Sequence, residues 1–159
     1  MTPSARPVTR RVALILGAAL IALTACSKPK TDEDRVRDVV QAVVGGAVDG
    51  DVGSVMQHVS GRYQGDSIDY DMLHAFLVEA FLRRGPLVIL PGPIDVTVTG
   101  DSAHASFNAA IAEGKGKWGD LVDADGWHLE VDFAREGSAG GPAPAGDPGE
   151  WRVVKYERQ

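Results

Sequence analysis

The stretch IDVTVTGDSAHASFNAAI, residues 94 to 111, carries the plainest structural signal of the chain. Apolar residues occupy every second position on both sides of Gly100-Asp101, and polar residues fill most positions between them. Successive side chains of a strand point to opposite faces of a sheet, so this period of two predicts two strands that share one apolar face. The Gly-Asp pair predicts the turn between them. The stretch therefore predicts an antiparallel hairpin with one buried face.

The same alternation continues toward the C-terminus. Apolar residues alternate with His128, Glu130 and Asp132 in a third stretch, at Trp127, Leu129, Val131 and Phe133. The segment EWRVVKYE, residues 150 to 157, predicts a final strand. Between the two lies a tract rich in Gly, Pro and Ala, residues 137 to 149, which predicts a long hairpin loop. On the N-terminal side, the apolar run LVIL at residues 87 to 90 precedes the turn at Pro91-Gly92-Pro93.

Helices are expected ahead of these strands. A variant capping box, Thr31 with Asp34, precedes an apolar stripe at helical spacing, formed by Val36, Val39, Val40, Val43 and Val44. The pair Gly45-Gly46 is expected to weaken this first helix near its end. A second, shorter helix is expected in DVGSVMQHVS, residues 51 to 60, with Ser60-Gly61 closing it.

A third helix is expected between Asp69, a favourable N-cap, and the terminator Gly85-Pro86. Basic residues in its last turn suit the helix dipole. Its expected buried face consists of Leu73, Phe76, Leu77, Ala80 and Phe81.

Helices followed by antiparallel strands form an α+β pattern, in which one face of a sheet is buried against helices. This order, with the Trp-led strand WRVV at residues 151 to 154 and the segment DVGSVMQHVSGRYQGD at residues 51 to 66, resembles the nuclear transport factor 2-like superfamily, also called SnoaL-like. The resemblance covers residues 34 to 157. It implies a strongly curved antiparallel sheet that wraps the long helix into a cone with a pocket inside, within the cystatin-like superfold. The competing fold is a cystatin-like single helix on a sheet, and three expected helices argue against it.

The N-terminus predicts an export signal. Three arginines lead into an apolar run of twelve residues, Val12 to Leu23, whereas a bilayer-spanning helix needs about 20. The sequence Leu23-Thr24-Ala25-Cys26 that follows resembles the lipobox of bacterial lipoproteins. That resemblance implies cleavage before Cys26 and a lipid on its sulfur. Two or three acyl chains would hold the protein firmly on a membrane.

The chain is therefore expected to have a signal peptide at residues 1–25, a lipidated tether at 26–33 and a single domain at 34–159. By resemblance to lipoproteins of diderm bacteria, Ser27 implies the periplasmic face of the outer membrane, provided that the cell has one. Removal of the signal leaves 13 Lys and Arg against 22 Asp and Glu, a net charge of −9. Nucleic-acid binding relies on a basic surface, so no nucleic acid is expected as a partner.

Apolar faces that look inward would line the pocket that the resemblance implies. The residues expected there are Leu73, Phe76, Leu77, Phe81, Phe107, Trp127, Leu129 and Val131, together with Trp118, which either covers the opening or fastens its loop to the sheet. His104, His128, Glu130 and Asp132 would then point outward as a solvated surface. The alternative is a metal site on His104 and His128, but no ligand-spacing motif supports it. We expect neither a metal nor a cofactor.

Two side chains are candidates for acid–base chemistry. His74 lies at the border of the third helix's buried face, and Tyr63 follows the second helix, where the resemblance implies a residue directed toward the mouth of the cone. Enzymes of this superfamily include isomerases and dehydratases with Asp, His or Tyr inside the cone, where burial shifts pKa values. The alternatives are a half-exposed boundary residue for His74 and an amphipathic core residue for Tyr63.

Three functions follow from these observations. The aliphatic interior and the absence of assignable inward acids favour non-catalytic binding of a small apolar ligand or a partner protein by a lipid-anchored domain. An isomerase, dehydratase or hydrolase would need His74 and Tyr63 within hydrogen-bond reach of each other or of one substrate atom. A structural module would form a homodimer through the open face of the sheet, as related cones often do.

Overall fold

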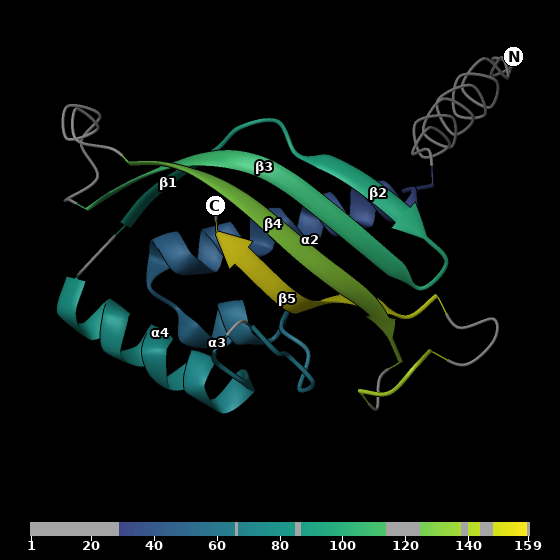
Figure 1. Ribbon diagram of the computed structural model, residues 1–159, viewed down its shortest axis with the longest axis horizontal. Coiled ribbons are helices and arrows are strands. Elements are labelled where there is room, and N and C mark those ends of the chain that lie inside the picture. The colour runs from purple at the N-terminus through teal and green to yellow at the C-terminus, as the bar shows by residue number, and fades with distance from the viewer. Residues whose placement is uncertain are drawn as a thin grey trace, which may run out of the picture. The chain divides into compact units, whose positions relative to one another are not determined.

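A computed structural model describes residues 29–65, 67–84, 87–113, 125–137, 140–143 and 148–158. The helices come first, and their bounds are α2 Asp32–Asp49, α3 Val52–Met56 and α4 Tyr70–Arg84. The strands follow as β1 Leu87–Pro91, β2 Asp95–Thr99, β3 Ser102–Glu113, β4 Asp125–Glu136 and β5 Glu150–Arg158 (Figure 1). The predicted α+β order of helices and strands is confirmed. Cys26, Trp118 and the predicted signal peptide lie outside the described residues.

One antiparallel sheet contains all the strands, in the order β1-β3-β4-β5. The strands β1 and β2 both pair with β3, β1 with its second half and β2 with its first half. The register of β3 with β4 places Phe107 opposite Leu129 and His104 opposite Asp132. A bulge between Asp132 and Phe133 interrupts the pairing of β4 with β5. Such a bulge increases the local twist of a sheet.

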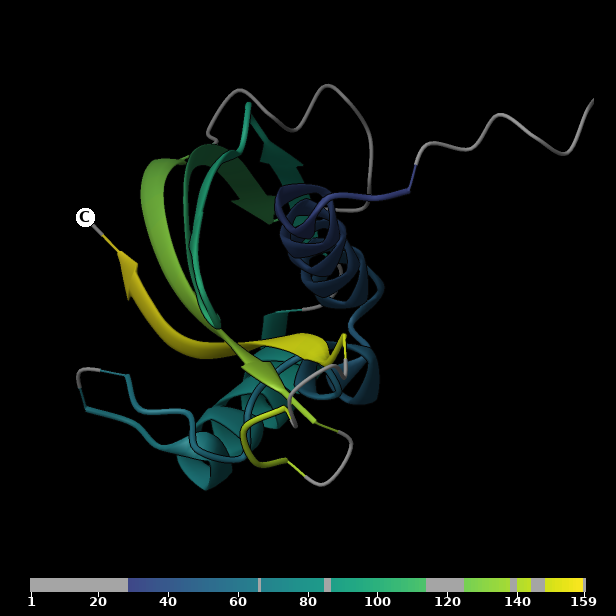
Figure 2. The same cartoon turned by 90° about the vertical axis from the view of Figure 1, so that its right-hand side faces the viewer.

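The sheet curls, and α2 lies against its concave face (Figures 1 and 2). The apolar positions of β3 and β4 face this helix, with Phe107, Leu129 and Phe133 exposed by only 5%, 7% and 1%. The predicted inward face is therefore confirmed. His104, His128, Glu130 and Asp132 lie on the opposite face, also as predicted. Helices on a curled antiparallel sheet constitute the predicted α+β cone.

The helix α2 begins as the sequence predicts, and Gly45-Gly46 lies near its end. Thr31 and Asp34 form a reciprocal capping box, in which the Thr31 side chain accepts a hydrogen bond from the Asp34 amide. The helix then continues through Gly45-Gly46 to Asp49. A Cβ at position 46 would lie 3.1 Å from side-chain and backbone atoms of α3. Gly46 therefore allows α3 to pack closely on α2, which offsets the low helix propensity of glycine.

The helix α3 is shorter than predicted because the following residues pair with the sheet. It ends at Met56, and Val59 forms an isolated parallel bridge with Val153 of β5. The Val153 amide donates to the His58 carbonyl at 2.9 Å, and the Ser60 amide donates to the Val153 carbonyl at 2.8 Å. These hydrogen bonds fix the segment after α3 along β5.

The helix α4 has the predicted N-cap, since the Met72 amide donates to Asp69 Oδ1 at 2.9 Å. Leu73 and Leu77 pack against the core. The predicted buried position of Phe76 is wrong, because its side chain is 55% exposed. Phe76 lies about 100° around the helix from Leu77, outside the narrow stripe that meets the core. Other large apolar side chains of α4 are exposed as well, namely Met72, Val78 and Leu82. Among the described residues, no helix has the length and apolarity needed to cross a membrane.

Candidate binding site

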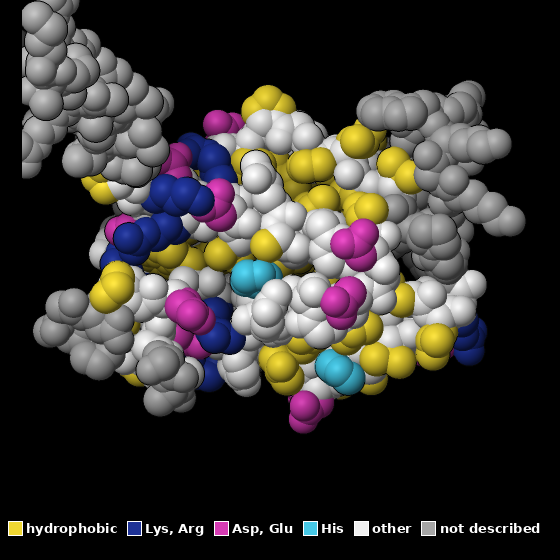
Figure 3. Space-filling model, turned by 180° about the vertical axis from the view of Figure 1, so that it is seen from behind, with side chains coloured by type: hydrophobic (Ala, Val, Ile, Leu, Met, Phe, Trp, Pro, Cys, Tyr) yellow, Lys and Arg dark blue, Asp and Glu magenta, His cyan; other side chains and the backbone are white. Residues whose placement is uncertain are grey.

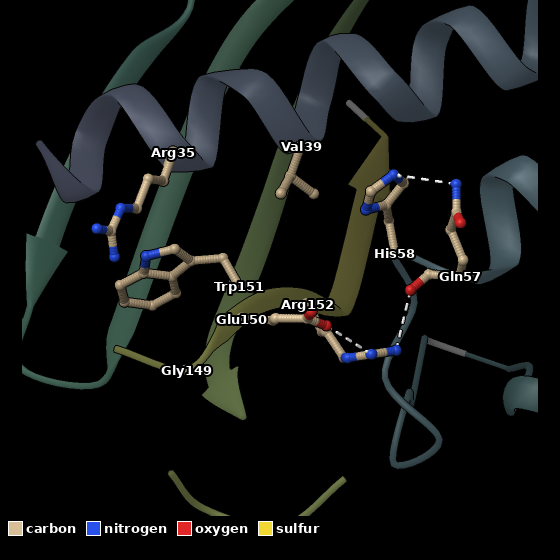
Figure 4. Close-up of a pocket in the computed structure, with 8 residues that line it drawn as sticks. All are labelled: Arg35, Val39, Gln57, His58, Gly149, Glu150, Trp151 and Arg152. Atoms are coloured by element: carbon tan, nitrogen blue, oxygen red, sulfur yellow. Dashed lines mark hydrogen bonds and ion pairs between the residues drawn. The ribbon is translucent and has the colours of Figure 1, made fainter. Parts of the chain in front are cut away.

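A groove of about 520 Å³ lies between α2, the end of α3 and the beginning of β5. We call it the α2–β5 groove. Its lining residues are Arg35 and Val39 from α2, Gln57 and His58 after α3, and Gly149, Glu150, Trp151 and Arg152 at β5 (Figure 4). Its volume lies within the range of roughly 300–1,000 Å³ that is common for small-molecule sites.

Helical spacing and backbone pairing hold the walls of the groove in place. Arg35 and Val39 are four residues apart, so both side chains project from the same face of α2 toward β5. His58 is held opposite them by the hydrogen bond between its carbonyl and the Val153 amide. In Figure 4 the imidazole points toward α2. Residues far apart in the sequence therefore face one space.

Trp151 supplies a rigid apolar edge. Its side chain is only 4% exposed, and the guanidinium of Arg135 lies 4.7 Å from the centre of its ring. Gly149, just before the strand, has a φ of +57°, and a Cβ there would approach the Cγ of Arg135 to 2.7 Å. Glycine is therefore required where the chain enters β5 beside Arg135.

Arg152 forms the polar floor of the groove, and its guanidinium is bound by acceptors of the protein. Its Nη1 donates to the Gln57 carbonyl at 2.9 Å, and its Nη2 donates to Glu150 Oε2 at 2.8 Å. Its Nε lies 4.0 Å from Glu136 Oε2. The charges of Arg152 and Glu150 thus largely neutralise each other at the edge of the groove.

His58 is half-buried in the groove, and burial lowers its pKa below 6.5. The positive charge of Arg152 lowers the pKa further, and the nearby carboxylate of Glu150 opposes both effects. His58 is therefore neutral near pH 7. Its Nε2 lies 3.4 Å from the Gln57 Nε2, a distance at which the amide can donate to the ring nitrogen.

Behind the groove, a buried carboxylate ties the α3–α4 segment to the sheet. Glu136 is only 1% exposed, and its Oε1 accepts from Ser60 Oγ at 2.7 Å and from Arg62 Nη2 at 2.6 Å. Ser60 is fully buried. Because Arg152 faces the other oxygen of Glu136, this cluster also limits the movement of the groove's floor.

The acid–base candidates Tyr63 and His74 lie in different surroundings. Tyr63 is 3% exposed and belongs to a second hollow of about 370 Å³, which is lined by residues 61–64 and 69–71. His74 is exposed on α4, outside the residues that line this hollow. Tyr63 also packs within the buried apolar cluster of the core.

The predicted pocket-lining residues divide into distinct groups. Phe107, Leu129 and Val131 are buried within the core, and Leu73, Leu77 and Trp127 are partly buried against it. Phe81 is half-buried, and Phe76 is exposed. The predicted interior is thus largely a packed core.

The outward histidines form cross-strand pairs. His104 Nδ1 lies 2.8 Å from Asp132 Oδ1, and His128 Nδ1 lies 3.1 Å from Asn108 Oδ1. Within the described part of the chain, no group of three or more His, Cys, Asp or Glu side chains is arranged to hold a metal ion.

Sequence reasoning did not single out Arg35, His58 or Arg152. None belongs to a motif, and the three line one groove only because α2 packs on the sheet and residues 58–60 pair with β5. One signal could have drawn attention to His58. It lies between Met56 and Val59, two apolar residues near the end of the predicted second helix.

Comparison with solved structures identifies the class of fold. The chain is similar to an NTF2-like protein of unknown function from Pseudomonas putida, with a TM-score of 0.63 and 16% identity over 80% of this chain and 84% of that one. It is similar to a protein of the NTF2-like family from Streptomyces avermitilis, named as a candidate dehydratase, with a TM-score of 0.63 and 14% identity over 82% and 96% of the two chains. An NTF2-like protein with a cystatin-like fold from Novosphingobium aromaticivorans gives a TM-score of 0.57 and 19% identity over 90% and 86%.

No family model and no curated protein matches the chain. Identities at this level show the fold alone. The fold is that of NTF2-like, cystatin-like proteins, which confirms the resemblance at the level of architecture.

Proposed function

We propose that this chain is a lipid-anchored, non-catalytic binding protein of the cell envelope, and that its ligand occupies the α2–β5 groove. The observation that carries the binding function is the composition of the groove. An apolar edge from Val39 and Trp151 stands beside five polar or charged side chains, among them a neutral imidazole. Small-molecule sites generally combine apolar walls with a few oriented polar groups.

The lipid anchor is supported by the N-terminal sequence, in which arginines, an apolar run and a lipobox-like segment follow one another up to Cys26. Cys26→Ser should prevent lipidation and move the protein from the membrane pellet to the supernatant after cell fractionation. A mutant that stays in the pellet would contradict the anchor without affecting the groove.

The binding function is tested by native mass spectrometry of the protein extracted gently from its own host's envelope. We expect a retained small molecule that is lost when Val39 is replaced by Asp, because a carboxylate would then occupy the apolar edge of the groove. Tyr63→Phe and His74→Ala should leave retention unchanged, because both residues lie outside the groove. An empty wild-type protein would contradict the proposal. Loss of the ligand in the Tyr63 or His74 variant would instead favour the acid–base pair as the site.

A further inference from the structure

The arginine that lines the α2 side of the groove has only a weak partner in the protein. The side chain of Arg35 is 42% exposed, and its guanidinium lies 3.7 Å from Asp32 Oδ1. The other oxygen of Asp32 is bound at 2.6 Å by Arg135, which also lies 3.4 Å from Asp101. The hydrogen bond from Arg135 is the main cause that lowers the pKa of Asp32. Asp32 is thus committed chiefly to Arg135, and Arg35 keeps N–H donors for another acceptor.

The remaining charged groups of the groove do not repel an anion. Glu150 is the acidic residue among the lining residues, and its carboxylate is already bound by Arg152 at 2.8 Å. The imidazole of His58 lies at the other end of the groove, beyond Val39, and is neutral near pH 7 (Figure 4). In a chain with a net charge of −6, this end of the groove therefore offers the guanidinium of Arg35 to an anion. Arginine binds planar carboxylates through two parallel hydrogen bonds.

Apolar groups lie next to Arg35 in the groove. Val39 follows it by one helical turn on the same face of α2, and the indole of Trp151 lies across from α2, on the side of β5 (Figure 4). A ligand that contacts Arg35, Val39 and Trp151 together needs an anionic end and an apolar body. A flat body fits better than a bulky one, because α2 and β5 bound the space on two sides.

We infer that the α2–β5 groove binds a small organic carboxylate, with the carboxylate on Arg35 and a flat apolar body against Val39 and Trp151. This inference rests on the proposed function and specifies the class of its ligand.

The test uses benzoate as the probe and benzamide as its neutral counterpart of nearly the same shape. Binding to the mature protein in detergent is measured by saturation-transfer NMR, with dissociation constants from titration. We expect benzoate to bind at least tenfold more tightly than benzamide, because only the carboxylate gains charge-assisted hydrogen bonds.

Arg35→Gln should weaken the binding of benzoate about tenfold and leave the binding of benzamide unchanged. Arg83→Gln is the matched control on α4, where the side chain is 77% exposed, and should leave both constants unchanged.

Equal binding of the two probes, no binding of benzoate, or a benzoate affinity that survives Arg35→Gln would overturn the inference. Arg35→Lys provides a second variant that keeps the charge and removes the fork, and it should lie between the wild type and Arg35→Gln. Native mass spectrometry of the protein from its host's envelope distinguishes failure of the carboxylate inference from failure of the proposed binding function. A neutral molecule retained from the envelope would contradict the carboxylate and preserve the binding function, whereas an empty protein would contradict the function itself.

Discussion

Glu136 is the buried carboxylate that joins the segment after α3 to the sheet behind the groove. Its buried carboxylate bonds Ser60 and Arg62 and faces Arg152. Glu136→Gln replaces one accepting oxygen with an amino group among donors, so the free energy of unfolding should fall by about 1–3 kcal/mol. Urea denaturation measures this change. Glu79→Gln, which breaks an exposed pair with Arg83 on α4, should change the free energy by less than about 0.5 kcal/mol. Equal effects of the two variants would show that the Glu136 cluster does not stabilise the fold.

His58 gives the stability of the protein a defined dependence on pH. Its pKa is lower in the folded protein than the value of 6.5 for an unperturbed histidine, so the unfolded chain binds the proton more readily. Above pH 6.5 the residue is neutral in both states. As the pH falls from 6.5 toward the lowered pKa, only the unfolded state gains the proton, and the free energy of unfolding decreases.

His58→Gln should therefore flatten the pH dependence of the free energy of unfolding just below pH 6.5, as measured by urea denaturation at several pH values. His74→Gln is the matched control because His74 is exposed on α4, and the slope should persist in it. A slope that is identical in the wild type and His58→Gln would show that His58 does not titrate in this way.

At the scale of elements, α4 is the helix whose faces the sequence specifies least clearly. Its apolar residues surround most of the helix, and only part of them meet the core. Hydrophobic side chains remain exposed on the face of the molecule that Figure 3 shows. Leu73 packs against the core, whereas Leu82 is 82% exposed. Leu73→Ala should lower the free energy of unfolding by about 1–3 kcal/mol, and Leu82→Ala should change it by less than about 0.5 kcal/mol. Thermal or urea unfolding of the pair checks the orientation of α4, and the reverse ranking would mean that the helix is rotated.

The capping box of α2 is an element-scale feature that the sequence predicted and the structure contains. The side chains of Thr31 and Asp34 each accept a hydrogen bond from the other residue's backbone amide at the start of α2. Thr31→Ala should cost about 1 kcal/mol of stability, since a free amide is left at the helix start. Thr31→Ser, which keeps the hydroxyl, should retain most of the stability, and circular dichroism during urea unfolding distinguishes the two.

For the whole molecule, the core joins α2, the segment after α3 and the sheet. Buried side chains from all three parts form one cluster, and residues Thr31–Gln159 make up one compact unit. A chain that starts at residue 27 should therefore unfold in a single transition. Far-UV circular dichroism and tryptophan fluorescence should give the same midpoint. Separate midpoints would show that part of the unit, such as α4, unfolds independently.

The strands, their inward faces and the caps of the helices could be predicted from the sequence because each depends on local geometry. Alternation at residues 94–111 and 127–133 fixes which side chains share a face, since successive residues of a strand always point to opposite sides. The caps at Thr31 and Asp69 depend on amides only three residues away. The order of these elements was sufficient for the α+β fold.

The sequence by itself therefore determined the elements, the apolar face of the sheet and the fold class, together with the N-terminal segment that predicts a lipid anchor. Only the tertiary structure decided where α3 ends, which face of α4 is buried and which residues meet in the α2–β5 groove. The physical reason is distance along the chain. Val59 pairs with Val153 of β5, the side chain of Phe76 is exposed, and Arg35, His58 and Arg152 line one groove. No local sequence pattern encodes these positions.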